Sequence, residues 1–271
     1  DQGFKDLIYI VAFERMELEE QIKTFIDINE KQTKVSPSLL WDLYPTILEK
    51  DDIKYRISTL VKRLNEQKES SLHGLISYDS APYSNKLPKL TLESVCTAIK
   101  TEKIIEDINA SMELLRIQNK EDSIAYSILS LWFQAIQESA PEHWNRRDKT
   151  LNLLRSNQGF GAMIKLLSRV IREFISNNTF ESIRTGEYDI IINEFKDYLA
   201  PIIKEVEKIK TKEEIKTWKR IGEGGKQQLF MDFVRIVRTI KSNFCDSLID
   251  SMNDPELDQI ILDLESNSEH Y

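Results

Sequence analysis

The sequence has few of the residues that usually build metal or redox sites. Its 271 residues include only two cysteines, Cys96 and Cys245, and three histidines in unrelated contexts, His73, His143 and His270. Two distant cysteines in helical patterns are typical of buried, reduced thiols in a cytoplasmic protein. A zinc cluster needs Cys and His ligands at short, regular spacings, so we expect neither a metal site nor a cofactor.

Long hydrophobic runs are also missing. The apolar stretches fall far short of the roughly 20 residues that span a bilayer, and no signal-peptide pattern precedes them. We therefore expect no membrane association. With 41% hydrophobic and 30% charged residues, the composition is that of a globular protein with one large domain or two small ones.

The common catalytic motifs are absent as well. No Ser or Cys stands in a nucleophile elbow, and there is no H-E-x-x-H motif. The run Gly222–Lys226 is rich in glycine, but it lacks the G-x-x-x-x-G-K-[ST] spacing and a preceding strand. A flexible connection is the simpler interpretation, although Gly224 and Gly225 would offer backbone N–H groups to a phosphate. An enzyme is therefore not the leading expectation.

Negative charge is concentrated at the C-terminus. Residues 242–271 hold eight of the 45 acidic residues and no Lys or Arg, so residues 1–241 carry 37 acidic and 37 basic residues. The net charge of −8 thus reflects the last segment and does not exclude a nucleic-acid-binding surface on the body. Apolar spacing in this segment predicts a helix over Pro255–Glu265 that packs on the body or on a partner chain.

Hydrophobic periodicity predicts a mainly α protein with a small N-terminal α/β remnant. We expect residues 1–80 to be part of an α/β domain, and residues 81–271 to be an irregular multi-helix domain with an acidic C-terminal helix. Strands are predicted at Leu7–Phe13 and within Ser70–Tyr78. The other predicted elements are helices: Met16–Ile28, Pro37–Lys50, a helix capped by Asp51 or Asp52 and ending near Gln67, Leu92–Ile108 capped by Thr91, a helix from Ile117 or Asn119 to Gln137, Ala162–Ile175, Glu187–Tyr198, Pro201–Ile209, Glu213–Trp218 and Gln227–Phe244.

Glycine and proline set several of these boundaries. Gly159 or Gly161 is expected to break the chain before the helix that begins at Ala162. Pro45 is expected to end or bend its helix, and Pro201 is expected to start a new one. Trp41, Trp132 and Trp144 sit in or beside apolar faces and are expected in the core. Trp218 has basic neighbours and could stack a base, but packing is the simpler interpretation.

One run joins two helices through a short polar connection. Phe25 and Ile28 have helical spacing, Asn29 is a natural helix terminator, and Ser36-Pro37 predicts an N-cap followed by proline at the first helical position. The pattern F-x-x-I-N-x-x-Q-x-x-V-S resembles the second half of the domain of DGQHR-motif proteins, among them the Dnd-type regulators of DNA phosphorothioation. Leu154–Ala162 and Gly222–Lys226 also resemble later stretches of that family, in the same order.

The resemblance implies a fold related to the ParB and sulfiredoxin superfamily. The Asp-Gly-Gln-His-Arg run itself is absent, and the chain opens at Asp1 without a start Met, so we expect a fragment whose diagnostic loop lies upstream. In that interpretation the amides of Asn29 and Gln32 complete a ligand or nucleic-acid site, because an amide offers both a donor and an acceptor. The alternative is local, with Asn29 capping its own helix and Gln32 bonding to the backbone.

Two basic segments are candidates for phosphate contacts. Residues 141–172 hold seven basic residues against two acidic ones, and three of the seven have helical spacing i, i+4, i+7. A second group follows Trp218 and continues to residue 241. Each group could instead be a solvated face balanced by acids from elsewhere. The candidate residues are Arg146, Arg147, Lys149, Arg155, Lys165, Arg169, Arg172, Lys219, Arg220 and Lys226, and the second group also includes Arg235, Arg238 and Lys241.

The leading hypothesis is a DNA-associated regulatory or defence-linked protein similar to the DGQHR family. A role in transcription regulation and phage defence follows from the resemblance alone. One alternative is a ParB-like nucleotide hydrolase or nuclease whose catalytic residues lie upstream of this chain. Another is a non-enzymatic assembly subunit that docks on a protein partner or on a second copy of itself.

Overall fold

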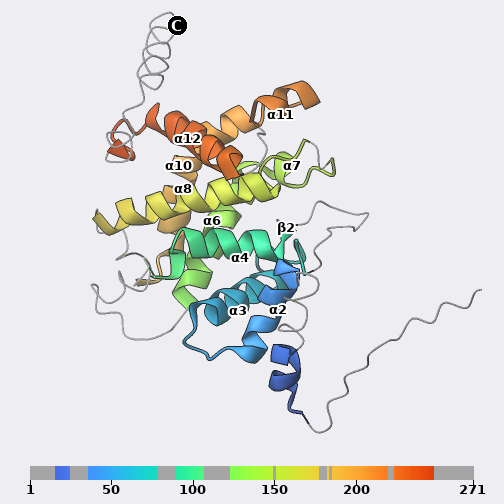
Figure 1. The fold of residues 1–271 in the computed structure, drawn as a ribbon. Helices are drawn as coiled ribbons and strands as arrows, with labels where there is room; N and C mark the ends of the chain where they lie inside the picture. The colour runs from blue at the N-terminus through green and yellow to red at the C-terminus, as the bar shows by residue number, and fades with distance from the viewer. Residues whose placement is uncertain are drawn as a thin grey trace, which may run out of the picture.

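The fold is mainly α. The computed structural model describes residues 16–24, 36–78, 90–106, 123–148, 151–176, 182, 185–218 and 223–246. Within them the chain forms helices and one pair of two-residue strands, so the predicted fold class is confirmed. Helices α2 (Pro37–Ile47) and α3 (Ile53–Glu66) lie toward one end of the molecule, and α12 (Glu223–Arg238) lies toward the other (Figure 1). In the described part, none of the helices is long and apolar enough to cross a membrane.

Most helices lie close to their predicted places. Residues 18–24 are helical, as expected within Met16–Ile28. The strand predicted at Leu7–Phe13 and the helix predicted at Pro255–Glu265 lie outside the described residues. The elements are α2 (Pro37–Ile47), α3 (Ile53–Glu66), β1 (Ile76–Ser77), β2 (Leu90–Thr91), α4 (Leu92–Thr101), α6 (Ser123–Ser139), α7 (Pro141–Trp144), α8 (Asn157–Ser176), α10 (Tyr188–Val206), α11 (Lys212–Trp218) and α12 (Glu223–Arg238).

Side-chain caps set three of the helix starts. The Ser36 hydroxyl accepts a hydrogen bond from the backbone N–H of Leu39 at 3.5 Å, with Pro37 at the first helical position. A carboxylate oxygen of Asp52 accepts from the N–H of Lys54 at 2.7 Å. The Thr91 hydroxyl accepts from the N–H of Ser94 at 3.2 Å. Ser36 and Thr91 were predicted as caps, and Asp52 was one of the two residues predicted for the third. Such caps can be predicted because they satisfy helix N–H groups of adjacent residues.

The two strands lie on opposite sides of the domain boundary that was predicted after residue 80. β1 and β2 are parallel, with Ile76 opposite Leu90 and Ser77 opposite Thr91, and β1 confirms the strand predicted within Ser70–Tyr78. The Asn65 side chain accepts the N–H of Ile76 at 2.9 Å and so fixes β1 to the end of α3. α2 and α3 both pack on α4, so segments on the two sides of residue 80 share contacts. The division into two domains stays a prediction.

One hydrophobic core runs from Trp41 to Phe244. α6 packs on α10, and α8 packs on both α4 and α12. Trp132 and Trp144 are completely or almost completely buried, and Trp41 is 7% exposed, so their predicted core positions are confirmed. Trp218 is half-buried against the core with its ring centroid 6.2 Å from that of Phe233, which favours the packing interpretation.

The break predicted at Gly159 or Gly161 is wrong. α8 begins at Asn157 and contains both glycines. The Ser156 hydroxyl accepts the N–H of Gly159 at 3.0 Å, and its carbonyl accepts the N–H of Phe160 at 2.8 Å, which is N-cap geometry. A Cβ on Gly159 would lie 1.9 Å from the Leu153 carbonyl oxygen. Glycine is needed there because the preceding loop crosses the first helical turn at close range.

One predicted boundary at a proline also needs correction, because α10 runs through Pro201, where two helices were expected. α2, predicted to be ended or bent at Pro45, ends two residues later at Ile47. An interior proline costs about 3 kcal/mol through a lost hydrogen bond and a clash. Buried side chains lie on both sides of Pro201, among them Leu199 and Ile202. Their burial against the core offsets this cost. α12 starts four residues earlier than predicted and ends at Arg238 instead of Phe244.

Candidate functional site

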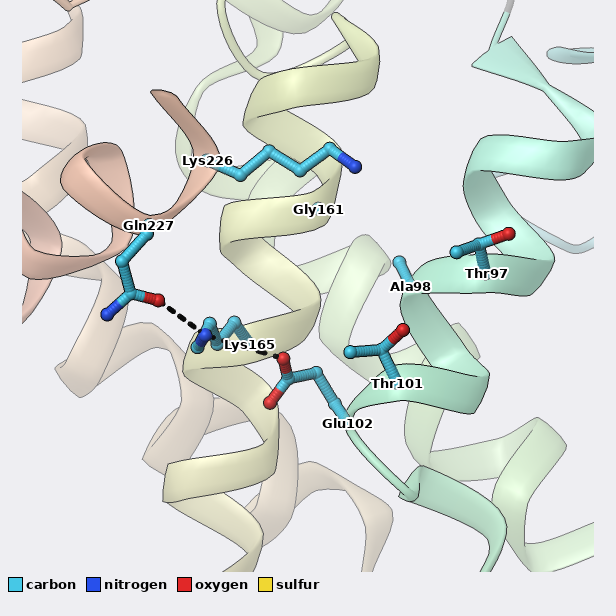
Figure 2. Close-up of a pocket in the computed structure, with 8 residues that line it drawn as sticks. All are labelled: Thr97, Ala98, Thr101, Glu102, Gly161, Lys165, Lys226 and Gln227. Carbon is cyan, nitrogen blue, oxygen red and sulfur yellow. Dashed lines mark hydrogen bonds and ion pairs between the residues drawn. The ribbon is translucent and has the colours of Figure 1, made fainter. Parts of the chain in front are cut away.

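A small pocket lies where α4, α8 and α12 meet. Its volume is about 140 Å³. Figure 2 shows that side chains from all three helices line it, with Thr97 and Thr101 on α4 opposite the residues of α8 and α12. The lining residues are Thr97, Ala98, Thr101, Glu102, Gly161, Lys165, Lys226 and Gln227. This pocket brings Lys165, from the first predicted basic segment, together with Lys226, from the second.

Lys165 ties the three helices together at the base of the pocket. Its ammonium donates a hydrogen bond to the Gln227 side-chain oxygen at 2.5 Å and lies 3.7 Å from a carboxylate oxygen of Glu102. It also lies 5.3 Å from the centroid of the Phe230 ring. The Lys165 side chain is 26% exposed and that of Glu102 is 13% exposed. Partial burial weakens solvent screening, but 3.7 Å is too long for a hydrogen bond, so Lys165 and Glu102 form a loose ion pair.

Lys226 reaches the pocket across a glycine. Its side chain extends over α8 at Gly161, with its nitrogen directed toward α4 (Figure 2). A Cβ on Gly161 would lie 3.2 Å from Cδ of Lys226 and 3.6 Å from its Cε, tighter than ordinary contact at the first of these. Gly161 therefore gives the aliphatic stem of Lys226 a path across the helix.

Hydroxyl and amide groups complete the lining. Thr97 and Thr101 are exposed and one turn apart on α4, which places both hydroxyls on the same face. Lys226 and Gln227 belong to the first two turns of α12, near the end of the helix where its dipole is positive. The described lining thus holds two cations, one carboxylate, two hydroxyls and one amide, a set suited to holding an anion.

Two arginines among the predicted phosphate contacts bond to backbone carbonyls. Arg155 is 2% exposed, and its guanidinium donates to the Trp144 carbonyl at 3.0 Å and lies over the Trp144 ring. Burial lowers the pKa of Arg155. Arg146 donates to the carbonyls of Leu151 and Ile209, at 3.2 and 2.9 Å. Arg155 is thus buried in this structure, where it bonds to α7, and Arg146 is half-buried and bonds to two backbone carbonyls. Contact of either arginine with a phosphate stays a prediction.

Other polar groups of the same loop belong to this internal network. Nε2 of His143 accepts the N–H of Leu153 at 3.1 Å, and His143 is 2% exposed. The Asn152 amide donates to the carbonyls of Trp144 and Arg146 and accepts the N–H of Arg155 at 3.0 Å. The loop around α7 is therefore held by hydrogen bonds to the backbone, and it fixes where α8 begins.

The remaining residues of the first segment do reach the surface. Arg147 and Arg172 are exposed, and Arg169 is half-buried on α8. Arg169 and Arg238 both lie close enough to Cys245 to lower its pKa, although burial dominates and raises that pKa to about 11. Lys165, Arg169 and Arg172 share one face of α8 by their spacing, and α12, which carries Lys226 and Arg238, packs on α8. We call this group the α8–α12 edge and define it as Lys165, Arg169, Arg172, Lys226 and Arg238.

Acidic groups accompany the edge. Arg238 pairs with Asp246 at 2.7 Å and also donates to the Phe244 carbonyl at 3.2 Å. Arg235 pairs with Asp232 at 3.0 Å on α12 itself. The Lys241 ammonium lies 4.0 Å from the centroid of the Tyr198 ring. The second basic segment is thus partly neutralised by its own neighbours, as the alternative interpretation of a balanced surface expected.

Several predicted site residues lie outside the part of the chain that the structure describes: Asn29, Gln32, Lys149, Lys219 and Arg220. Sequence reasoning also missed the four other polar residues of the pocket: Thr97, Thr101, Glu102 and Gln227. The i, i+4 spacing of the two threonines was visible in the sequence, but only the packing of α4 against α8 shows that this face meets the lysines.

Metal chemistry and known relatives give no further assignment. Among the residues that the structure describes, no three His, Cys, Asp or Glu side chains are grouped so that they could hold a metal ion. No family model matches the chain, and no match was found among curated proteins or solved structures. The resemblance to DGQHR-motif proteins stays a prediction from short motifs.

Proposed function

We propose that this protein is a DNA-associated regulatory protein that binds backbone phosphates along the α8–α12 edge. The observation that carries the proposal is the convergence of Lys165 and Lys226, which come from two separate basic segments and line one pocket. Phosphate contacts need clustered positive charge on flexible side chains, and they fix position on the duplex without reading its sequence.

The length of the edge supports several contacts. Lys165, Arg169 and Arg172 follow one another on α8 at intervals of four and three residues, which is one stripe of about 10 Å at 1.5 Å rise per residue. Successive phosphates of one DNA strand are several ångströms apart, so this stripe matches two or three of them. Arg238 continues the positive charge on the neighbouring helix.

Carboxylates along the edge set the strength of binding. Glu102 forms an ion pair with Lys165, and Asp246 forms one with Arg238. Glu173 lies near Cys245. A phosphate must replace or share these partners, so binding exchanges one ion pair for another. We therefore propose a modest affinity that depends steeply on salt, as expected for non-specific backbone contacts.

The family resemblance adds the biological context of the proposal. In DGQHR-like regulators the part of the chain that contains Asn29 and Gln32 would complete a ligand site begun upstream. In the proposal, the helical body described here supplies the backbone contacts, and the N-terminal part supplies selectivity. With these two roles, the protein would act in the regulation of DNA modification or in defence, as the family resemblance implies.

The proposal is tested with a fluorescent duplex and a salt titration. Fluorescence anisotropy of the intact chain gives the affinity at several salt concentrations, for the wild type and for the double variant Arg169→Gln/Arg172→Gln. The variant should bind more weakly, and the slope of log K against log salt should become shallower by about 0.9 for each phosphate that the protein no longer neutralises.

The matched control removes the same charge elsewhere. Lys50→Gln/Lys68→Gln changes two exposed lysines near α2 and α3, at the opposite end of the molecule from α12 (Figure 1). It should leave both affinity and slope unchanged. Equal losses in the two double variants would mean that only net charge matters, and that the edge is not the binding surface.

A further inference from the structure

We infer that the pocket between α4, α8 and α12 binds a single phosphate group. The inference rests on the proposed function in treating the pocket as one phosphate position of the α8–α12 edge, and it adds the chemical class that this position takes. Its basis is the size of the pocket, the identity of its polar groups and the path of Lys226.

Size limits the ligand to one small anionic group. A water molecule occupies about 30 Å³ in the liquid, so the pocket's 140 Å³ corresponds to a handful of waters. Sites for whole small molecules typically measure about 300–1,000 Å³. The pocket therefore accepts a phosphate or a phosphodiester unit with a few waters, whereas a complete nucleotide does not fit inside it.

Charge selects an anion over a neutral group. The residues that line the pocket include two lysines, Lys165 and Lys226, and one carboxylate, Glu102. Lys165 donates to Gln227 and lies 3.7 Å from Glu102, a distance that leaves this ion pair loose. An ammonium has three N–H donors, so Lys165 can keep Gln227 and still donate to a bound oxygen.

The geometry places donors from two helices at the pocket. Lys226 enters over Gly161. Thr97 and Thr101 stand on α4 across the pocket from it, with their methyl groups toward the lysines and their hydroxyl oxygens turned away (Figure 2). The first turn of α12 adds positive potential from the helix dipole. A tetrahedral oxyanion presents acceptors in every direction, so it can accept from Lys165 of α8 and Lys226 of α12 at the same time. Rotation of a threonine side chain about χ1 would add a hydroxyl donor from α4. The two oxygens of a planar carboxylate lie in one plane and would leave some of the donors around the pocket without an acceptor.

The test uses inorganic phosphate as the probe and isothermal titration calorimetry of the intact chain in chloride buffer. The wild type should bind one phosphate, and Lys226→Met should weaken binding about tenfold or more, because it removes a charge-assisted hydrogen bond. Thr101→Val, which keeps the shape of the side chain, should weaken binding by a smaller factor. Lys50→Met is the matched control and should bind phosphate as the wild type does.

Competition with duplex DNA separates this inference from the proposed function. If DNA displaces the bound phosphate, the pocket belongs to the DNA-binding edge. Phosphate binding that DNA does not displace supports the pocket as a site for free phosphate and contradicts its place in DNA binding. Absence of saturable phosphate binding by the folded wild type, or unchanged binding by Lys226→Met, overturns the inference even when DNA binds elsewhere on the protein.

Discussion

Replacing Gly159 with alanine gives the sharpest test of how α8 begins. The added Cβ would lie 1.9 Å from the Leu153 carbonyl oxygen and 2.8 Å from the Leu153 carbonyl carbon. Both are backbone atoms of a loop held in place, so no flexible side chain can move aside. The same carbonyl oxygen accepts the Ser156 hydroxyl at 2.7 Å, so moving the loop also disturbs the cap of the helix.

The expected cost follows from this overlap. Overpacking in a close-packed interior usually costs about 1–3 kcal/mol and occasionally more. A backbone overlap with little room to relax belongs at the upper end, so Gly159→Ala should lower the free energy of unfolding by about 3 kcal/mol or more. The small gain in helix propensity from alanine, about 1 kcal/mol, opposes this loss but does not cancel it.

Gly224 is the matched control for this change. It also lies in the first turn of a helix, and no heavy atom lies within 4 Å of a Cβ built on it. Gly224→Ala should therefore leave stability unchanged or raise it by about 0.5 kcal/mol, because alanine restricts the unfolded chain. Urea unfolding followed by circular dichroism measures both variants. Equal stability of Gly159→Ala and the wild type would refute the close approach and restore the predicted break before Ala162.

Three further predictions test other parts of the structure. Arg155→Met should lower the free energy of unfolding, measured in urea titrations, by about 2 kcal/mol, because it removes a charge-assisted hydrogen bond. The DNA affinity of the folded variant should be unchanged. Normal stability together with abolished DNA binding would instead support a phosphate contact by Arg155. The Lys196 ammonium lowers the pKa of Glu138 through a hydrogen bond. The wild type should therefore melt at a higher temperature than Glu138→Gln at pH 7, and this difference should vanish as the pH falls below about 4, the ordinary pKa range of a Glu carboxyl. A difference that persists at low pH would contradict the ion pair. Cys245 has a pKa raised to about 11, mainly by burial, so iodoacetamide at pH 8 should modify it much more slowly than free cysteine, and an equal rate would contradict its burial.

The helix starts were predictable because their causes are local. Ser36, Asp52 and Thr91 each cap a helix through a hydrogen bond that reaches at most three residues along the chain. Such contacts can be read from a few consecutive residues. The errors occurred where a distant part of the chain overrides the local signal. At Gly159 the decisive atom belongs to the preceding loop, and at Pro201 the burial of α10 keeps the helix continuous.

The candidate site was predictable only as a set of charges. Lys165 and Lys226 were recognised as basic residues, but their meeting requires α8 and α12 to pack against each other. Arg146 and Arg155 had the same signal in the sequence and yet bond to carbonyls inside the structure. A count of positive residues cannot separate these cases, since it does not show which backbone carbonyls need a donor. This explains why part of a basic segment can be structural while another part reaches solvent.

The carboxylates on the edge suggest how the two proposed binding events are linked. Glu102 forms an ion pair with Lys165 at one end of the edge, and Asp246 forms one with Arg238 at the other. Asp246 is also the first acid of the C-terminal segment that holds eight acids and no Lys or Arg. In the proposed function, a phosphate in the pocket competes with Glu102, and a phosphate farther along competes with Asp246. Each contact then contributes only the difference in free energy between the new ion pair and the one it replaces. Several contacts must therefore form together before binding becomes strong. Such a surface would favour a long polyanion such as DNA over isolated phosphate everywhere on the edge except in the pocket, where Lys165 and Lys226 act on one group.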